Sequence, residues 1–539
     1  MASDYPYLNF GDLFEAVAAT FPERTAVIYG GDRLSWQDLD RRANRLARAL
    51  SVMGLEPGSK VAFYLRNSPA YVELFAACAK GRFVHANVNY RYVAEELHYL
   101  LDNADAEVVA YDAEFRGEID KLRDRLPTVK AYLEVGGSPH EGPAFALPFE
   151  VCCREGSAEP LGNERSGEDL YFMYTGGTTG YPKAVMWPAA ARIAAIGMTP
   201  APDVASHIEL LKQADHAPVA LPAAPLMHST GLTTMLSTLV NGGTLVLLPT
   251  RSFDAAACLA QLEAHRVERL ALVGDAFSLP LLEALEAEPG RYDLDSVKLI
   301  SSAGAMWSER LKQGLLRHFT AAQLSDSLGS SEGSRIGIST TRPGESGATG
   351  RFRPGEGVKL FREDFTEVAA GSGEAGRLAK AGPLPLGYYK DEAGTASTFP
   401  VVDGVRYSMA GDWCRLEADG TMTLLGRGNN CINTGGEKVY PEEVEEALKQ
   451  VPGVKDAAVL GMPDERWGER VTAIVRGSTP APSTEAIQDH LSQNLARYKH
   501  PRVLLLTDVE FRHENGKINY REARRIMAAH LENSAHSGE

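Results

Sequence analysis

The chain has 539 residues, of which 44% are hydrophobic and 23% charged, and it carries a net charge of −16 at pH 7. This length exceeds what one hydrophobic core organises and predicts about two to four domains. The acidic balance argues against nucleic acid or an anionic membrane surface as the main partner, because like charges repel. A nucleotide site must therefore collect positive charge locally, from a few lysines and arginines and a metal ion.

The cysteines and the start of the chain bear on location. Six scattered cysteines lack the Cys-x-x-Cys spacing, which favours reduced thiols in a cytoplasmic protein. The first residues show neither the basic region nor the apolar region of a secretory signal. No run of about 18 apolar residues occurs, so we expect no transmembrane segment. These features predict a soluble, cytoplasmic protein.

The first part of the chain alternates strands with helices. Residues 26–36 predict a hairpin around two glycines, and residues 39–50 predict a helix with leucines and an alanine on one face. The elements expected next are a strand at 60–65, helices at 71–79 and 95–101, and a strand at 107–111. This alternation predicts an open α/β architecture with a mainly parallel sheet.

The middle of the chain repeats this rhythm and then turns glycine-rich. Strands are expected at 244–248, 270–273 and 298–302, with helices between them. Short alternating runs then predict a small β-subdomain at about 344–425.

The character changes again after Gly426. Residues 441–449 predict a helix, because proline and acids occupy the first turn and lysine the last. Strands at 457–460 and 471–475 and a helix from about Thr484 would complete a compact α+β unit. We place the boundary near Asn430, which gives an N-terminal domain at 1–429 and a mobile C-terminal domain at 430–539.

One stretch indicates phosphate binding. An apolar run at 170–173 predicts a buried strand, and it is followed by Tyr174-Thr-Gly-Gly-Thr-Thr-Gly-Tyr-Pro-Lys183. Three glycines permit close backbone approach, while backbone N–H groups, threonine hydroxyls and a lysine suit a polyphosphate. The spacing is neither that of a Walker A loop nor that of a dinucleotide-binding turn.

Five further stretches join this loop in chain order. They are residues 225–231, 326–332, 407–412, 426–441 and 515–517. In this order, from about residue 9 to 530, the motifs resemble those of the adenylate-forming (AMP-binding) superfamily of acyl- and aryl-CoA synthetases, luciferases and peptide-synthetase adenylation domains. Short stretches such as Asn87-Val-Asn-Tyr-Arg91 and Cys431-Ile-Asn-Thr-Gly-Gly-Glu-Lys-Val are most similar to the sequences of bacterial fatty-acyl and steroid-acid CoA ligases.

The resemblance implies a two-step ligase. A carboxylate attacks the α-phosphate of ATP, which gives an acyl-adenylate and pyrophosphate; the C-terminal domain then rotates, and the thiol of CoA displaces AMP. Neither step requires a protein nucleophile, because positioning and charge neutralisation carry this type of transfer. The implied substrates and cofactor are a small carboxylic acid, ATP, CoA and Mg²⁺.

The resemblance also implies roles for matching residues. Lys517 would reach the α-phosphate and bridging oxygen, Glu332 would bind Mg²⁺ together with Thr175, and His228 would gate the acyl pocket. The ATP- and AMP-binding set would be Thr175, Gly176, Gly177, Thr178, Thr179, Gly180, Lys183, Ala303, Asp326, Leu328, Gly329, Ser331, Asp412 and Arg427. The CoA set would be Gly435, Gly436 and Glu437, and the acyl pocket would include His228, Gly231, Met235 and Gly304.

Three positions depart from the family pattern. Leu328 stands where a tyrosine usually stacks on adenine, which removes an aromatic contribution of about 0.5–1.5 kcal/mol. Asn430 replaces the hinge aspartate, and Ala184 replaces a glycine after the loop lysine. We expect both of the latter changes to be tolerated.

Several alternatives stay open from the sequence. The protein could load a carrier protein, act as an aryl-CoA ligase or a luciferase-like oxygenase, or be an AMP-binding pseudoenzyme. The pseudoenzyme alternative is disfavoured because the chain retains all five charged residues of the motifs, Lys183, Glu332, Asp412, Arg427 and Lys517. The acid could be a steroid side-chain acid, a branched or medium-chain fatty acid, or an aryl acid, and a homodimer is possible.

Overall fold

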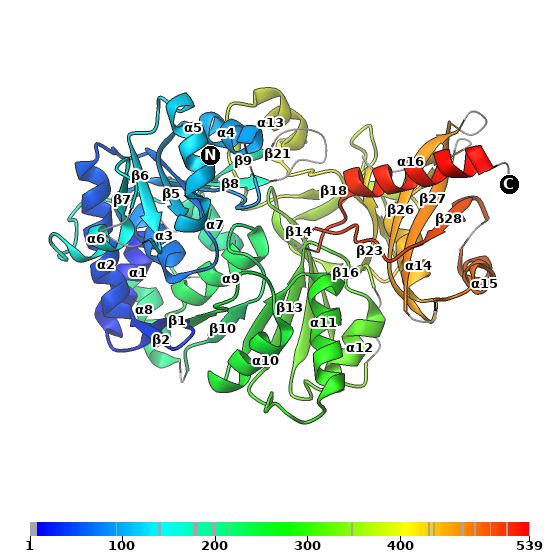
Figure 1. Ribbon diagram of the computed structural model, residues 1–539, viewed down its shortest axis with the longest axis horizontal. Coiled ribbons are helices and arrows are strands. Elements are labelled where there is room, and N and C mark those ends of the chain that lie inside the picture. The colour runs from blue at the N-terminus through cyan, green and yellow to red at the C-terminus, as the bar shows by residue number, and fades with distance from the viewer. Residues whose placement is uncertain are drawn as a thin grey trace.

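The computed structural model describes residues 8–92, 94–137, 142–175, 182–196, 201–214, 216–345, 349–428, 432–434, 437–464, 468–478, 481–495, 497–513 and 516–537. Within these ranges three large sheets carry the fold, and a short ribbon, β20 (Val401–Val402) with β21 (Val405–Arg406), stands beside them. Figure 1 shows the blue-to-green part of the chain at the left and centre and the orange-to-red part at the right.

An eight-stranded sheet organises the first part of the chain. Its inner strands pair in parallel, whereas β8 and β9 form an antiparallel hairpin at one side. In spatial order the strands are β19 (Gly387–Tyr388), β9 (Lys183–Pro188), β8 (Leu170–Thr175), β4 (Val84–Asn87), β3 (Lys60–Tyr64), β5 (Ala106–Asp112), β6 (Ala131–Val135) and β7 (Ala146–Pro148).

A thirteen-stranded sheet forms the second layer. It is parallel from β1 to β14 and antiparallel beyond β14, so the expected β-subdomain continues this sheet instead of standing apart. In spatial order the strands are β17 (Val358–Phe361), β18 (Ala375–Lys380), β22 (Asp412–Leu416), β23 (Met422–Arg427), β16 (Arg351–Pro354), β15 (Ser334–Thr341), β14 (Gln323–Ser330), β13 (Leu299–Ala303), β12 (Arg269–Leu272), β10 (Val219–Pro222), β11 (Thr244–Leu247), β1 (Thr25–Tyr29) and β2 (Asp32–Ser35).

Helices cover both sheets, and several begin at a side chain that caps the first turn. Ser35, for example, accepts a hydrogen bond from the Asp38 N–H, which satisfies a backbone donor that has no partner within the helix. The helices of this part are α1 (Phe10–Thr20), α2 (Trp36–Val52), α3 (Pro69–Gly81), α4 (Ala94–Asn103), α5 (Arg116–Leu122), α6 (Phe149–Arg154), α7 (Ala189–Ala195), α8 (Val204–Gln213), α9 (Ser229–Val240), α10 (Ala255–Ala264), α11 (Gly274–Ala287), α12 (Glu309–Leu316) and α13 (Glu392–Thr398).

The C-terminal part has a sheet and a core of its own. Buried Val444, Leu448, Val459 and Ile487 share one apolar cluster between the sheet and two helices. The strands are β24 (Ile432–Thr434), β25 (Glu437–Val439), β26 (Val454–Asp464), β27 (Gly468–Gly477) and β28 (Val503–Leu506), and the helices are α14 (Pro441–Lys449), α15 (Thr484–Asn494) and α16 (Tyr520–Ser537). We refer to residues 432–537 as the C-terminal part and to the preceding residues as the N-terminal part.

The parallel strands β10, β12 and β13 determine where a site can form. Their carboxyl ends lead into the turn before α9, the start of α11 and the turn at Gly304. Open α/β sheets bind their ligands at this edge, because loops and helix N-termini meet there. The turn of the C-terminal part that carries Gly516 and Lys517 also lies at this edge, against Val273 and Ala276.

Most elements expected from the sequence are confirmed. The hairpin at 26–36, the helix at 441–449 and the strands near 60, 107, 244, 270 and 298 all form, and the fold is α/β as predicted. The polar segment at 136–167 contains β7 and α6. The boundary residue Asn430 lies outside the described residues, so the domain limits stay a prediction. Among the described helices, none has the length and apolarity needed to cross a membrane.

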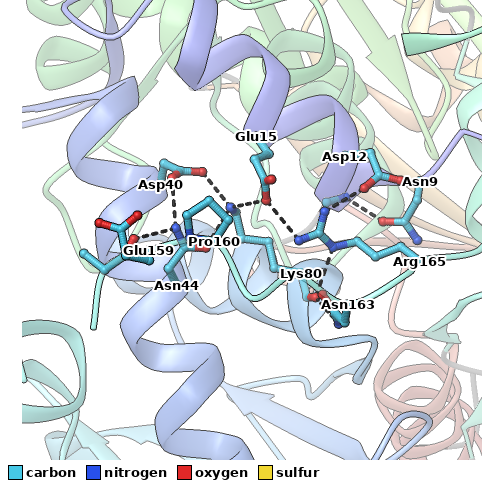
Figure 2. Close-up of polar contacts among 12 residues, drawn as sticks. Asn9, Asp12, Glu15, Asp40, Asn44, Lys80, Glu159, Pro160, Asn163 and Arg165 are labelled. Carbon is cyan, nitrogen blue, oxygen red and sulfur yellow. Dashed lines mark hydrogen bonds and ion pairs between the residues drawn. The ribbon is translucent and has the colours of Figure 1, made fainter. Parts of the chain in front are cut away.

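A fully buried lysine ties the N-terminal helices together (Figure 2). The Lys80 ammonium lies 3.0 Å from the Glu15 carboxylate and 2.6 Å from the Asp40 carboxylate, and it donates to the Asn44 amide oxygen at 2.8 Å. Arg165 extends the network by pairing with Glu15 at 2.9 Å. These contacts join α1, α2 and α3 to the chain around residue 165.

Replacing Lys80 by methionine should therefore destabilise the protein. The variant leaves the facing acids without their buried partner, and we expect a loss of about 3 kcal/mol in the free energy of unfolding, measured by urea denaturation. Lys121→Met is the control, because Lys121 forms an exposed pair with Glu118 and should change stability by less than about 0.5 kcal/mol. Equal effects of the two substitutions would contradict this prediction.

Candidate active site

The predicted phosphate loop connects two antiparallel strands. Thr175 at the end of β8 stands opposite Lys183 at the start of β9, so the strands hold the two ends of the loop together. Residues 176–181 lie outside the described residues, and with them the expected contributions of Gly176, Gly177, Thr178, Thr179 and Gly180. The Lys183 ammonium pairs with the Asp391 carboxylate at 2.7 Å and lies 5.1 Å from the centre of the Tyr388 ring. Since a half-exposed ion pair contributes little, Lys183 can exchange Asp391 for a polyphosphate.

Glu332 lies in the turn between β14 and β15. Its carboxylate is largely buried and accepts a hydrogen bond from the Tyr388 hydroxyl at 2.9 Å. The turn is tight because a Cβ at Gly329 would overlap the carbonyl oxygen of Ser334, so only glycine fits there. The Trp187 indole donates to the Ser331 carbonyl at 2.9 Å and anchors the turn on β9. Tyr388 thus contacts both Lys183 and Glu332, which the sequence had placed in separate motifs.

Asp326 and Leu328 face the interior from β14. The Asp326 carboxylate accepts a hydrogen bond from the Lys312 ammonium at 2.9 Å, and both side chains are buried. Leu328 packs in an apolar cluster with Ile336, Phe352 and Cys414 among others. One oxygen of Asp326 is therefore engaged by a residue that the sequence did not single out. The expected nucleotide contacts of Asp326 and Leu328 stay predictions.

Asp412 and Arg427 stand opposite each other on β22 and β23. Asp412 is 7% exposed, and Gly411 before it has a positive φ of 100°, a conformation that favours glycine. The side chain of Arg427 lies outside the described residues. The register brings these two predicted nucleotide ligands to the same end of a strand pair, and their roles stay predictions.

The turn before α9 carries His228 and contacts the end of β13. His228 precedes the first residue of α9, and its N–H donates to the Pro225 carbonyl at 3.1 Å. A Cβ at Gly231 would overlap that same carbonyl, so the close approach requires glycine. The Thr230 hydroxyl donates to the Ala303 carbonyl at 3.3 Å, which joins α9 to the end of β13. The predicted pocket residues therefore lie around one junction, except that Met235 is fully buried in the core.

Lys517 reaches this junction from the C-terminal part. A Cβ added at Gly304, whose φ is 91°, would lie 3.9 Å from the Lys517 Cε and 3.9 Å from the Thr230 hydroxyl oxygen. The preceding Gly516 packs against the start of α11, where an added Cβ would lie 3.0 Å from the Ala276 Cβ and 3.1 Å from the Val273 carbonyl oxygen. The structure thus brings Lys517 close to Gly304 and the turn of His228, and the roles expected of these residues stay predictions.

Positive charge gathers around His228. Burial, together with the charges of Lys517, Arg91 and His513, lowers the pKa of His228 to about 3. Burial, Arg91 and Lys517 also lower the pKa of His513. His228 is therefore neutral at physiological pH and adds no repulsion, while the lysine and arginine attract an anion. The sequence assigned no role to Arg91 and His513 in this region, nor to Tyr388 beside Lys183 and Glu332.

The predicted CoA-binding residues lie largely outside the described part of the chain. Gly435 and Gly436 lie outside the described residues, and Glu437 opens β25 opposite Thr434, with its side chain also outside them. Within the described residues, no group of three or more His, Cys, Asp or Glu side chains forms a ready metal site.

Comparison with known proteins identifies similar families and folds. Residues 14–389 match the family described as AMP-binding enzyme, and residues 443–517 match the AMP-binding enzyme C-terminal domain. The chain is 37% identical to a 3-oxocholest-4-en-26-oate–CoA ligase of Rhodococcus rhodochrous, covering 96% of this chain and 95% of that protein. It is also 37% identical to a medium/long-chain-fatty-acid–CoA/3-oxocholest-4-en-26-oate–CoA ligase of Mycobacterium tuberculosis, covering 98% of both. In fold it is similar to an anthranilate CoA ligase in complex with anthranoyl-AMP, with a TM-score of 0.84, 24% identity and coverage of 97% and 98% of the two chains.

The lowered pKa of His228 has a measurable consequence for stability. Between pH 6.5 and 3 the unfolded chain binds the proton that the folded His228 rejects, so the free energy of unfolding falls as the pH falls. Urea denaturation at pH 7 and at pH 5 measures how much the free energy of unfolding falls between the two pH values. This fall should be about 2 kcal/mol smaller in His228→Gln than in the wild type. Identical losses in both proteins would show that His228 is not shielded from protonation.

Proposed function

The chain belongs to the family of AMP-binding enzymes, and from this membership we propose that it is an AMP-forming acyl-CoA ligase that joins a fatty or steroid side-chain acid to CoA. The observation that carries the proposal is the position of Lys517 beside Gly304 and the turn of His228. A lysine from the C-terminal part adds positive charge at this junction, where a nucleotide phosphate would need it.

The first half-reaction would be adenylation of the acid. A carboxylate oxygen forms a bond to the α-phosphorus of ATP, and the bond from that phosphorus to the bridging oxygen breaks, which releases pyrophosphate. Lys183 would neutralise the departing phosphates from the mouth of the β8–β9 loop. Lys517 would neutralise the α-phosphate and the bridging oxygen, where charge develops in the transition state.

His228 supports this step by staying neutral. A protonated imidazole would add a third charge beside Lys517 and Arg91 and would hold the acid carboxylate as an ion pair. A neutral imidazole can donate one hydrogen bond to the carboxylate without lowering its nucleophilicity as strongly. The burial and the neighbouring cations that lower the pKa of His228 favour this role.

Mg²⁺ would be held by Glu332 with Thr175. A buried carboxylate that already accepts a hydroxyl hydrogen bond is a hard oxygen ligand of the kind this cation prefers. The bound cation would supply charge neutralisation for the phosphates. Tyr388 would keep the Glu332 carboxylate oriented, since it contacts Glu332 on one side and Lys183 on the other.

The second half-reaction would form the thioester. The CoA sulfur bonds to the acyl carbon, the bond from that carbon to the AMP oxygen breaks, and AMP leaves. By the family resemblance, the C-terminal domain rotates for this step, and Gly435, Gly436 and Glu437 line the path of the thiol. A cytoplasmic location and a homodimer also stay predictions from the sequence.

The class of acid follows from the relatives. Those cited above are named for fatty acids and for 3-oxocholest-4-en-26-oate, and they cover nearly the whole chain. We therefore propose a medium- or long-chain fatty acid or a steroid side-chain acid as substrate.

A screen of acids tests the proposal. With ATP, Mg²⁺ and CoA, pyrophosphate release should require a fatty or steroid side-chain acid, and mass spectrometry should detect the CoA thioester of that acid. Thioester formation only on a carrier protein, or only with aryl acids, would overturn the proposed substrate classes. No acid-dependent pyrophosphate release with any acid would overturn the ligase assignment.

Lys517→Ala separates the two half-reactions. Removing a positive charge that acts on the adenylation transition state should slow acid-dependent pyrophosphate release at least about a hundredfold. Thioester formation from pre-formed acyl-adenylate and CoA should stay close to the wild-type rate, which serves as the control for folding. Unimpaired adenylation in this variant would show that Lys517 does not have the proposed role.

A further inference from the structure

Two ion pairs connect α11 of the N-terminal part to the C-terminal part. The Lys449 ammonium lies 3.5 Å from the Asp275 carboxylate, and the two side chains are 4% and 11% exposed. The Lys455 ammonium lies 3.7 Å from the Glu283 carboxylate, and these side chains are 44% and 56% exposed. The two pairs have similar lengths, but only the first is shielded from water. Charges attract each other more strongly when they are shielded from water, so the first pair is the stronger one.

The N-terminal part fixes Asp275 by itself. One carboxylate oxygen accepts a hydrogen bond from the Ser308 N–H at 2.8 Å, and the other oxygen faces Lys449. Gly274 before it has a positive φ of 51° and leaves no room for a Cβ beside the Met306 carbonyl. The N-terminal part therefore holds the Asp275 carboxylate in place independently of Lys449.

The C-terminal part holds Lys449 in its charged form. Lys449 is the last residue of α14 and is buried among acids of its own domain. Burial disfavours the ammonium, yet Asp275, Glu446 and Asp456 raise the pKa of Lys449 above its usual value. A charge buried at this junction favours the one domain arrangement in which Asp275 faces it.

The lysine turn is fixed to the same framework. Arg512 donates to both oxygens of Asp456, at 2.6 and 2.8 Å, and to the Gly516 carbonyl at 2.7 Å. Within the turn, the His513 N–H donates to the Lys517 carbonyl at 2.9 Å. The turn that carries Lys517 therefore moves with β26 and the rest of the C-terminal part.

Both connections meet the N-terminal part at one short stretch. Gly516 packs against Val273 and Ala276, and Lys449 pairs with Asp275, which lies between them in the sequence. Two contacts at neighbouring positions fix the relative orientation better than one, because a single contact leaves the C-terminal part free to pivot. The buried ion pair therefore meets α11 directly beside the contact made by the turn of Lys517.

We propose that Asp275 and Lys449 are positioning residues for the adenylation half-reaction, which orient the C-terminal part so that Lys517 faces Gly304 and His228. The inference rests on the proposed ligase function. Rotation of the C-terminal part would separate the pair and return both charges to water, where they are well solvated. The pair therefore favours one arrangement without locking it, as a two-step enzyme requires.

The test measures the two half-reactions separately in full-length Lys449→Met and Asp275→Asn variants. Acid-dependent pyrophosphate release should fall at least about tenfold in each, because the population with Lys517 in place decreases. Thioester formation from pre-formed acyl-adenylate and CoA should remain within about twofold of the wild type. The double variant should be no slower than the slower single variant, since both changes remove the same interaction.

Two further variants control the result. Lys449→Arg keeps the charge and should retain most of the adenylation rate, whereas Lys455→Met removes the exposed pair and should leave both rates unchanged. The inference is overturned if both half-reactions fall together in the Lys449→Met and Asp275→Asn variants, which would indicate a purely structural pair. It is also overturned if neither half-reaction changes, or if Lys455→Met has the same effect. Failure of the wild-type enzyme to release pyrophosphate would instead overturn the proposed function.

Discussion

An acidic chain that handles a polyphosphate must concentrate its few positive charges at one place, and this constraint governs the structure. The net charge is −16, yet Arg91, His513 and Lys517 lie close enough to His228 to lower its pKa. Cations gathered without a bound anion repel one another, so the protein must hold them by other contacts. It does so with the close backbone approach at Gly304 and Gly516 and with a neutral histidine.

This constraint also explains why the site is assembled from two parts of the chain. Lys183 and Glu332 belong to the N-terminal part and are linked through Tyr388, whereas Lys517 arrives on a turn of the C-terminal part. A cation supplied by a separate part can be withdrawn once its step is complete. A site formed within one rigid core would keep its charges in place, and the thiol would meet the same surroundings as ATP.

The sequence predicted local features well and long-range pairings poorly. The helix at 441–449, the hairpin near Gly30 and the parallel strands all carry patterns within a few residues, and the motifs around Glu332, His228 and Lys517 identified the family. Tyr388, the Asp326–Lys312 pair and the Asp275–Lys449 pair were missed, because burial and pairing between distant residues leave no periodic signal. The sequence also did not predict that the β-subdomain strands continue the large sheet. The pattern within one segment does not reveal which distant segment pairs with it.

The central claim is that the acid attacks the α-phosphorus of ATP, and isotope transfer tests it most directly. The protein would be incubated with ATP, Mg²⁺, CoA and an acid whose carboxylate carries ¹⁸O. Attack at the α-phosphorus followed by thiol displacement leaves one of the labelled oxygens on AMP, so mass spectrometry should find ¹⁸O in AMP and none in pyrophosphate. Label in a phosphate released from the β or γ position, with unlabelled AMP, would contradict the account.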